Sequence, residues 1–385
     1  MAKPKILLAS YTVPENKMGG ALLLFRHFVL KNDFEIGVVT NNPVKVPGVF
    51  YRHLPEPRLL NRLKRTRFSL LAGDYTELIH SRLFNRRLYA AAKEFQPDLI
   101  FNVAETYFSF HAQMLAKKLG VPLVTYFMDW ANFGTRTHQW ALPHMDRMFR
   151  RLYQQADLAF CISEGMRNEL GPHPNAHVLY PIGADTDLAA RPDPTANDHF
   201  TFCFAGNLDR WYGTMVHDLM QASELEPTVR LRVFGANHRW PVEFVKGQII
   251  KGVFHGFRPF EQLIPELQKA DAFLLPMGFG ADAALIERTS FKTKLLDYIL
   301  FEKPILVWGP EYSTAIAIAR KYECAHCVTN PSPKAALAGM KELAQDRSLR
   351  EILVQNARKM RAAEFTQGKT YSILKTELEK LLIRK

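Results

Sequence analysis

Cysteine is scarce in this chain of 385 residues, which contains only four. So few thiols cannot build the disulfide framework of a secreted protein, and the sequence favours a reducing compartment. Cys324 and Cys327 form one C-x-x-C pair, and no second pair accompanies it. A structural zinc site needs four ligands, and a redox pair stands at the start of a helix. We therefore expect neither role for this pair.

Long apolar runs and targeting segments are also missing. The opening segment KILLAS (5–10) is too short for the apolar region of a secretory signal. No run approaches the roughly 18 apolar residues that a membrane-spanning helix needs. We expect a cytoplasmic protein that is at most peripheral to the cytoplasmic face of a membrane.

Acidic side chains are under-represented in one region of the sequence. The chain has a formal net charge of +12, and residues 52–93 carry ten basic and three acidic side chains. Such a segment favours an anionic partner, either lipid head groups or an acidic glycan. Nucleic acid is not expected, because no nucleic-acid-binding module is recognisable.

Strands and helices alternate along most of the sequence, which is 47% hydrophobic. Alternation of this kind predicts parallel sheets with helices on both faces. Expected helices include 75–95, 108–119, 143–155, 164–170, 260–271 and 369–384, while 41–70 is expected to be irregular. The expected strands are 5–10, 35–40, 97–103, 121–129, 156–163, 178–183, 200–206, 229–235, 249–256, 272–277, 303–309 and 325–330.

The predicted fold is α/β, with two Rossmann-like doubly wound parallel-sheet domains facing across a cleft. The polar, proline-containing stretch 184–198 divides the two sets of strands. We expect an N-terminal domain (1–185), a linker (186–199), a second domain (200–365) and a C-terminal helix (366–385).

The segment TSFKTKLLDYILFEKPILVWG (289–309) is the most informative part of the sequence. Ser290, Lys294 and Asp297 are spaced four and three apart, so a helix capped by Ser290 would carry them on one face. A helix N-terminus and a cation suit phosphates, and a carboxylate suits ribose hydroxyls. The alternative is a solvated face of an ordinary amphipathic helix.

Several loops after predicted strands carry further candidates. Gly19 and Gly20 open a helix after the first strand, although the dinucleotide pattern G-x-G-x-x-G is absent. In the second half, Gly206 and Arg210 follow one strand and Arg258 follows another, where they could contact phosphates and a nucleobase. For the two glycines, the alternative is a tight turn that contacts no ligand. For the arginines, the alternative is an ordinary position on the protein surface.

Two carboxylates end strands of the first half, Glu105 after IFNV and Asp129 after VTYFM. Ligands of α/β domains bind beyond the carboxyl ends of strands, so both are candidates for contact with a reacting hydroxyl. Carboxylates at such positions also cap helices, which is the alternative for each.

Together, ADLAFCISEGMRNEL (156–170), VLYPIGAD (178–185), a strand ending in AGN (205–207) and SFKTKLLDYILFEKPIL (290–306) resemble a GT-B glycosyltransferase. The likeness is to the family 4 type of sugar-nucleotide-dependent transferases and covers nearly the whole chain. It implies a nucleotide-sugar donor site on the C-terminal domain (200–365) and a site for a glycan or lipid-linked acceptor on the N-terminal domain (1–185). It also implies that the C-terminal helix packs back on the N-terminal domain, and that the protein acts in polysaccharide biosynthesis.

The resemblance also implies roles for individual residues. The implied catalytic residues are Asp129, Arg210 and Lys294, and acceptor binding is implied for Glu105 and Asp129. Asp297 stands at the position that binds the ribose. The implied donor-binding residues are Gly19, Gly20, Gly206, Arg258, Thr289, Ser290, Phe291 and Asp297.

Four positions depart from the family pattern. Thr289 replaces the first of two paired glutamates, Asn207 replaces an arginine, Trp211 or Tyr212 replaces a later lysine, and Met128 replaces a histidine. These changes keep two alternatives open, namely a non-catalytic GT-B partner subunit and a GT-B sugar-nucleotide epimerase.

The expected chemistry uses no cofactor and no metal, since no DxD-like motif stands out and the nucleoside diphosphate sugar is the substrate. The resemblance implies retention of the anomeric configuration, with the donor phosphate accepting the proton and Asp129 orienting the acceptor. If the reaction inverts instead, Asp129 is the expected general base.

Overall fold

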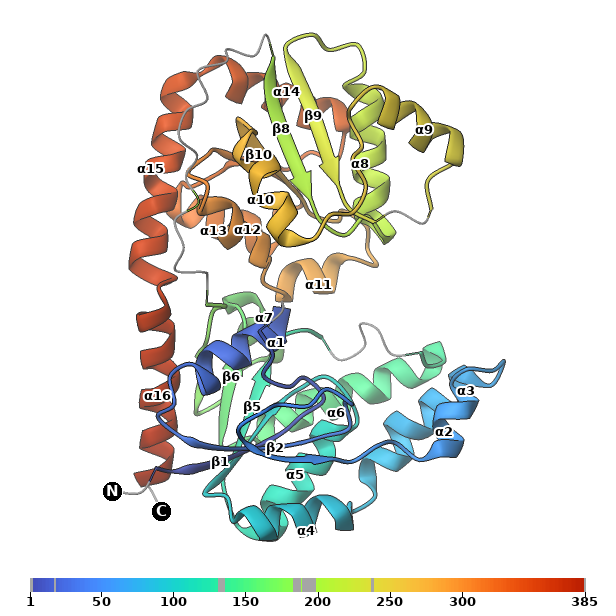
Figure 1. Cartoon of the computed structure of the whole chain (residues 1–385), viewed down its shortest axis with the longest axis vertical. Coiled ribbons are helices and arrows are strands. Elements are labelled where there is room, and N and C mark those ends of the chain that lie inside the picture. The colour runs from blue at the N-terminus through green and yellow to red at the C-terminus, as the bar shows by residue number, and fades with distance from the viewer. Residues whose placement is uncertain are drawn as a thin grey trace. The chain divides into compact units, whose positions relative to one another are not determined.

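The computed structural model describes residues 3–16, 19–130, 136–182, 188, 199–236 and 239–383. The chain divides into two compact units, one formed by residues 1–182 and 368–385 and the other by residues 183–367. Figure 1 shows that each unit contains a sheet flanked by helices. Most of the expected linker, 186–199, lies outside the described residues.

The first unit is built on a seven-stranded, all-parallel sheet in the order β3-β2-β1-β4-β5-β6-β7. The order reverses between β1 and β4, which is the switch point at which ligands bind in such sheets. The strands are β1 (Lys5–Ala9), β2 (Glu35–Thr40), β3 (Phe50–His53), β4 (Leu99–Val103), β5 (Leu123–Phe127), β6 (Leu158–Cys161) and β7 (Ala176–Val178).

Helices and single turns connect these strands. They are α1 (Gly19–Leu24), η1 (Phe25–Val29), α2 (Arg58–Leu63), α3 (Ser69–Asp74), η2 (Tyr75–Ile79), η3 (His80–Arg82), α4 (Arg86–Phe95), α5 (Phe108–Leu119), η4 (Gln139–Ala141), α6 (Leu142–Gln155) and α7 (Glu164–Leu170). The C-terminal helix α16 (Gln367–Ile383) contacts this unit, because Tyr371 donates a hydrogen bond to Asp33 and Lys375 forms an ion pair with the same carboxylate.

The second unit has a five-stranded parallel sheet in the order β12-β11-β10-β8-β9. Its strands are β8 (Phe200–Ala205), β9 (Val229–Phe234), β10 (Ala272–Pro276), β11 (Ile305–Trp308) and β12 (His326–Val328). Its helices are α8 (Arg210–Ala222), α9 (Val242–Ile250), α10 (Phe260–Gln268), α11 (Ala284–Thr289), α12 (Thr293–Ile299), α13 (Thr314–Tyr322), α14 (Pro333–Gln345) and α15 (Arg347–Glu364).

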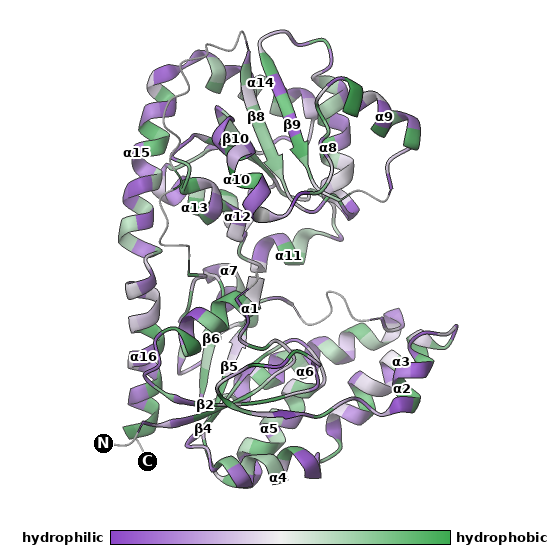
Figure 2. Cartoon of the chain, in the orientation of Figure 1, coloured by the Kyte–Doolittle hydropathy of each residue, from purple (hydrophilic) through white to green (hydrophobic). Residues whose placement is uncertain are grey.

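Burial follows the pattern that parallel sheets require. Every residue of β4, β5, β6, β10 and β11 is buried, as expected for strands covered on both faces. The covering helices are amphipathic instead. In Figure 2, hydrophobic and hydrophilic residues alternate along α15, which buries Leu353, Ala357 and Met360.

Four expected elements are wrong. The strand expected at 178–183 lies earlier in the sequence, as β7 at Ala176–Val178. In place of the expected strand 249–256, α9 runs to Ile250 and an irregular segment follows it, in which the amides of Val253 and Phe254 donate to the carbonyl of Gln248. Only one bridge, between Val233 and Phe254, remains there. The expected irregular stretch 41–70 contains β3 and α2; β3 is a four-residue edge strand that is at most half-buried, so it lacks a hydrophobic pattern.

The expected helix 75–95 is interrupted. The helical conformation ends after η3, because Leu83 is extended. A new helix, α4, begins at Arg86, where Asn85 accepts a hydrogen bond from the amide of Leu88 at 3.0 Å. Asparagine is among the strongest N-cap residues, so it restarts the helix at this point.

Candidate active site

A pocket of about 190 Å³ opens where β8 and β10 end, at the switch point of the second sheet. The loop after β8 contributes to one side, and the turn between α11 and α12 contributes to the other. The lining residues are Phe204, Asn207, Tyr212, Leu275, Pro276, Phe291, Lys292, Thr293 and Lys294.

Lys292 is anchored in this pocket by a buried carboxylate. Its Nζ lies 2.7 Å from the hydroxyl of Tyr212 and 3.2 Å from Oε2 of Glu287, which is fully buried. The other oxygen of Glu287 accepts hydrogen bonds from the Tyr212 hydroxyl at 2.7 Å and the Gly278 amide at 3.0 Å. Burial favours the neutral amine, but Glu287 and Tyr212 outweigh it and raise the pKa of Lys292.

Lys294 reaches the same pocket without such an anchor. Its side chain lies over Gly206, where a Cβ atom would come within 2.3 Å of Cε of Lys294. Burial lowers the pKa of Lys294, which the carboxylate of Asp297 opposes and the charge of Lys292 reinforces. A second negative charge in the pocket would favour the protonated form of Lys294, and a diphosphate supplies such charge.

The predicted helix start at Ser290 is wrong. Ser290 terminates α11, its amide donates to the carbonyl of Ile286 at 2.8 Å, and Lys292 is the residue that precedes α12. The Ser290 amide is therefore already used within the protein. Thr289 is also buried and donates its hydroxyl to the carbonyl of Leu285 at 2.7 Å.

Of the two predicted arginines in this unit, neither lines the pocket. Arg210 is exposed at the start of α8, with φ of +56° and its guanidinium 5.8 Å from the centre of the Trp211 ring. Arg258 lies 3.1 Å from a carboxylate oxygen of Glu266 and over the ring of Phe234. Their predicted contacts with phosphate and nucleobase stay predictions. Phe291 does line the pocket.

In the first unit, the predicted glycines lie beside the end of β5. Gly19 has φ of +61°, a left-handed conformation that glycine adopts without strain. A Cβ atom on Gly20 would approach Sδ of Met128 to 2.9 Å, so the two segments touch. Asp129 follows Met128 and is exposed.

Asp129 and Glu105 are close enough to interact electrostatically. Burial raises the pKa of Glu105 to about 7, a hydrogen bond from Thr12 opposes this shift, and the charge of Asp129 adds to it. A carboxyl group with such a pKa exchanges its proton near neutral pH, which suits a general acid or base.

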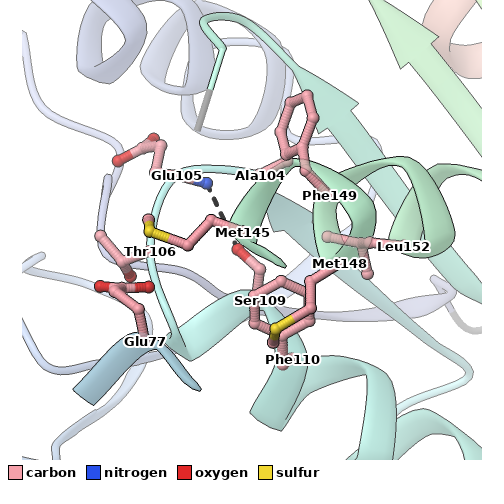
Figure 3. Close-up of a pocket in the computed structure, with 10 residues that line it drawn as sticks. All are labelled: Glu77, Ala104, Glu105, Thr106, Ser109, Phe110, Met145, Met148, Phe149 and Leu152. Atoms are coloured by element: carbon pink, nitrogen blue, oxygen red, sulfur yellow. Dashed lines mark hydrogen bonds between the residues drawn. The ribbon is translucent and has the colours of Figure 1, made fainter. Parts of the chain in front are cut away.

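A small pocket separates Glu105 from α6, and a second carboxylate lines it (Figure 3). Figure 3 shows the carboxyl groups of Glu77 and Glu105 on the same side of this pocket. Glu77 belongs to η2, is 9% exposed, and has its pKa raised by burial to about 7. The amide of Glu105 points toward the hydroxyl of Ser109, 3.4 Å away.

Sequence reasoning missed Lys292, Glu287, Tyr212 and Glu77. The available signal for Lys292 was its spacing of two from Lys294 in FKTK. A helix from residue 290 would send these two lysines to nearly opposite sides, whereas the actual start at Thr293 leaves both free to face one pocket.

Within the described ranges, no group of three or more His, Cys, Asp and Glu side chains could hold a metal ion. No helix in the described part of the chain is long and apolar enough to cross a bilayer.

Comparisons with known proteins place this architecture. Residues 31–187 match the model of Glycosyltransferase Family 4. Sucrose-phosphate synthase from Thermosynechococcus elongatus superposes with a TM-score of 0.69 at 13% identity over 100% of both chains. The fold is that of the GT-B glycosyltransferases.

Two further GT-B structures support this assignment. HepE from Anabaena, solved with UDP, gives a TM-score of 0.69 at 15% identity over 98% of this chain and 100% of its own. WaaG, a glycosyltransferase involved in lipopolysaccharide biosynthesis, gives a TM-score of 0.60 at 12% identity over 96% of this chain and 98% of its own. A comparison with curated protein sequences finds no significant match. The predicted resemblance and fold class, two Rossmann-like parallel-sheet domains, are confirmed.

Proposed function

We propose that this protein transfers a glycosyl group from a nucleoside diphosphate sugar to a glycan or lipid-linked acceptor. The observation that supports this most is the pair of lysines, Lys292 and Lys294, at the switch point of a GT-B fold. Two cations in one partly enclosed pocket match the charge of a diphosphate. HepE, which shares the fold, was solved with UDP and with UDP-glucose.

In the proposed reaction, the bond between the sugar C1 and the diphosphate oxygen breaks while the acceptor oxygen bonds to C1. The leaving diphosphate gains charge, which Lys292 and Lys294 stabilise without a metal, with Arg210 as a further candidate. A preorganised donor of this kind is often worth about 3 kcal/mol of activation free energy. Asp297 binds the ribose in this proposal.

The acceptor hydroxyl is proposed to bind the first unit near Asp129 and Glu105. If the configuration is retained, a donor phosphate oxygen takes the acceptor proton and Asp129 orients the hydroxyl. The electrostatic proximity of the two carboxylates supports this placement. Asp129→Asn is expected to lower kcat by about 10²-fold or more, with nucleotide binding unchanged.

The direct test is a thermal-shift screen of the full chain against UDP, GDP, ADP, TDP and CMP. A ligand at about 100 times its dissociation constant stabilises the folded state by roughly 2.7 kcal/mol. Lys292→Met is expected to remove most of the shift for the binding diphosphate. If no nucleotide shifts the unfolding temperature, the donor assignment is wrong.

A non-catalytic partner subunit is the second candidate, because Thr289 replaces a family glutamate and its buried hydroxyl is bonded to Leu285. Such a protein would bind the nucleotide yet release no free diphosphate product with any acceptor. An epimerase would instead convert the donor sugar without an acceptor. Analysis of products formed from the donor alone separates it from a transferase.

We further propose that residues 52–93 contact an anionic membrane surface, on the cytoplasmic side. Besides its excess of basic side chains, this segment exposes Leu59, Leu71 and Ile79, each more than half exposed. Apolar and basic side chains together suit a lipid interface. Flotation with anionic vesicles tests this, and equal binding to neutral vesicles would count against it.

A further inference from the structure

A second, larger pocket lies within the first unit, with a volume of about 620 Å³. It opens at the carboxyl ends of four neighbouring strands, because Tyr11 follows β1, Asn41 follows β2, His53 ends β3 and Thr106 follows β4. This is the switch point of the first sheet, and the volume is in the usual range of small-molecule sites, roughly 300–1,000 Å³.

The inner wall offers groups that suit hydroxyls. Asn41 donates a hydrogen bond to the hydroxyl of Tyr107 at 3.1 Å, and Asn61 of α2 also lines the pocket. Glu77 also lines this pocket, and its raised pKa lets it donate or accept a hydrogen bond near neutral pH. Sugar hydroxyls both donate and accept, so amide, phenol and carboxyl groups can bind them.

The charge balance of the lining is positive. Glu56 and Lys64 neutralise each other in an ion pair of 2.8 Å. Arg65 and Arg136 remain, both exposed at the pocket, and neither has a carboxylate partner among the described residues. Two arginines without counter-ions favour a ligand with a negative charge, since guanidinium groups bind phosphate and carboxylate through paired hydrogen bonds.

Arg136 is held in place by its surroundings. The backbone amide of His138 donates to Asp74 at 2.9 Å, and Nδ1 of His138 lies 2.6 Å from the other oxygen of Asp74. Gly73 leaves room for this segment, because a Cβ atom there would lie 1.8 Å from the carbonyl oxygen of Arg136. These contacts fasten the backbone at Arg136 to α3, so the point from which this side chain extends toward the pocket is fixed.

We propose that this pocket binds a saccharide or polyol that carries a phosphate or carboxylate group, with Arg65 and Arg136 contacting the anion. The proposal rests on the proposed function, because such a ligand would be the acceptor of the transfer. It names the chemical class of that acceptor as anionic.

The test measures binding of glucose, glucose 6-phosphate and glucuronate to the full chain by calorimetry. We expect both anionic probes to bind at least tenfold tighter than glucose, a ratio equivalent to about 1.4 kcal/mol. The double variant Arg65→Ala/Arg136→Ala should bring the three affinities within threefold of one another. Arg87→Ala is the matched control, because it removes an exposed arginine of the same unit that does not line the pocket.

Octyl glucuronide, compared with glucuronate, separates a lipid-linked source of the anionic sugar from a soluble one; tighter binding of the octyl form indicates a lipid-linked acceptor. The inference is overturned if no probe binds, if glucose binds as tightly as the anionic probes, or if the double variant keeps the preference. Nucleotide binding, measured on the same samples, reports on the donor site separately. A preparation that binds a nucleotide but no anionic sugar therefore contradicts only this inference.

Discussion

The two units bury carboxylates in opposite ways. In the second unit, Glu287 is fully buried with a lysine beside it, at 3.2 Å from Nζ of Lys292. In the first unit, Glu77 and Glu105 have no lysine or arginine in direct contact among the described residues, and burial raises the pKa of each to about 7. The same residue type thus pairs with a cation in one unit, whereas in the other it has no cation in contact and its pKa is raised by burial.

This difference matches the two halves of the proposed reaction. A leaving diphosphate needs positive charge that is present before the bond breaks, and Glu287 keeps Lys292 protonated. An acceptor hydroxyl needs neighbours that can both accept and donate a hydrogen bond, which a carboxyl group does near its pKa.

Removing Glu287 should give the largest effect. Glu287→Ala leaves the charge of Lys292 poorly compensated and removes the acceptor of two hydrogen bonds, from Tyr212 and from the Gly278 amide. Loss of one partner of a buried ion pair typically costs about 3–5 kcal/mol. Urea denaturation of the full chain measures the loss.

Two variants check the cause of that loss. Glu287→Gln keeps an oxygen that can accept the hydrogen bonds and should cost less than the alanine change. Glu311→Gln removes a carboxylate from an exposed ion pair with Arg320 and should leave the free energy of unfolding nearly unchanged, because solvent screens exposed pairs. Equal losses of unfolding free energy for Glu287→Ala and Glu311→Gln would show that the buried pair contributes no more to stability than an exposed pair.

Glu77 should give the corresponding effect in the first unit, but with a dependence on pH. Folding raises its pKa from 4.5 to about 7, so between these values the folded state binds more protons than the unfolded state. Stability contributed by Glu77 is therefore lost as pH rises through this interval. Since glutamine does not titrate, Glu77→Gln should gain about 1–3 kcal/mol relative to the native chain between pH 4.5 and 8.

The measurement is the free energy of unfolding of both proteins at several pH values, and the informative quantity is their difference. Glu94→Gln is a suitable control, because Glu94 is exposed and pairs with Arg52. A flat difference for Glu77→Gln across this range would mean that Glu77 is ionised at neutral pH, and the contrast between the units would disappear.

The sequence predicts the sheets well and the donor pocket only in part. Buried strands such as β4 and β10 are short apolar runs bounded by proline or by small residues, so their pattern is clear. Lys294, Phe291 and Gly206 were predicted from one segment and one loop, and the structure brings these residues together around one pocket. The predicted helix start at Ser290 failed because the Ser290 amide is used by α11.

The missed residues depend on contacts between distant segments. Glu287 meets Tyr212 across 75 residues of sequence, and no local pattern encodes that contact. Glu77 lies in η2, a π-helical turn inside a stretch that reads as a regular helix. Its raised pKa follows from burial, which depends on how α6 and the loop after β4 pack around it.

Gly206→Ala tests the donor pocket of the second unit without changing the first unit. The new Cβ atom would lie 2.3 Å from Cε of Lys294, so the flexible lysine must move while the backbone can stay. We expect nucleotide diphosphate affinity to fall by about tenfold, which corresponds to roughly 1.4 kcal/mol. Calorimetric titration measures this change.

Gly247→Ala is the control for Gly206→Ala, because nothing lies within 4 Å of a Cβ atom at Gly247. This helical position should gain stability slightly on replacement, with no change in nucleotide binding. Unchanged affinity in Gly206→Ala would show that Lys294 does not contact the diphosphate from its position over Gly206.

Two asparagines that follow strands give the smallest expected effect and compare the pockets directly. Asn207 accepts a hydrogen bond from the amide of Asp209 at 2.8 Å, and Asn41 donates to the Tyr107 hydroxyl at 3.1 Å. Asn207→Ala should cost about 1 kcal/mol or less, because the exposed amide can bond to water instead. Asn41→Ala should cost at least as much, because the Tyr107 hydroxyl is largely buried and loses a donor. Urea denaturation measures the loss of unfolding free energy in each variant. A larger loss for Asn207→Ala would indicate that the Asn207 side chain holds the turn after β8 in a strained conformation.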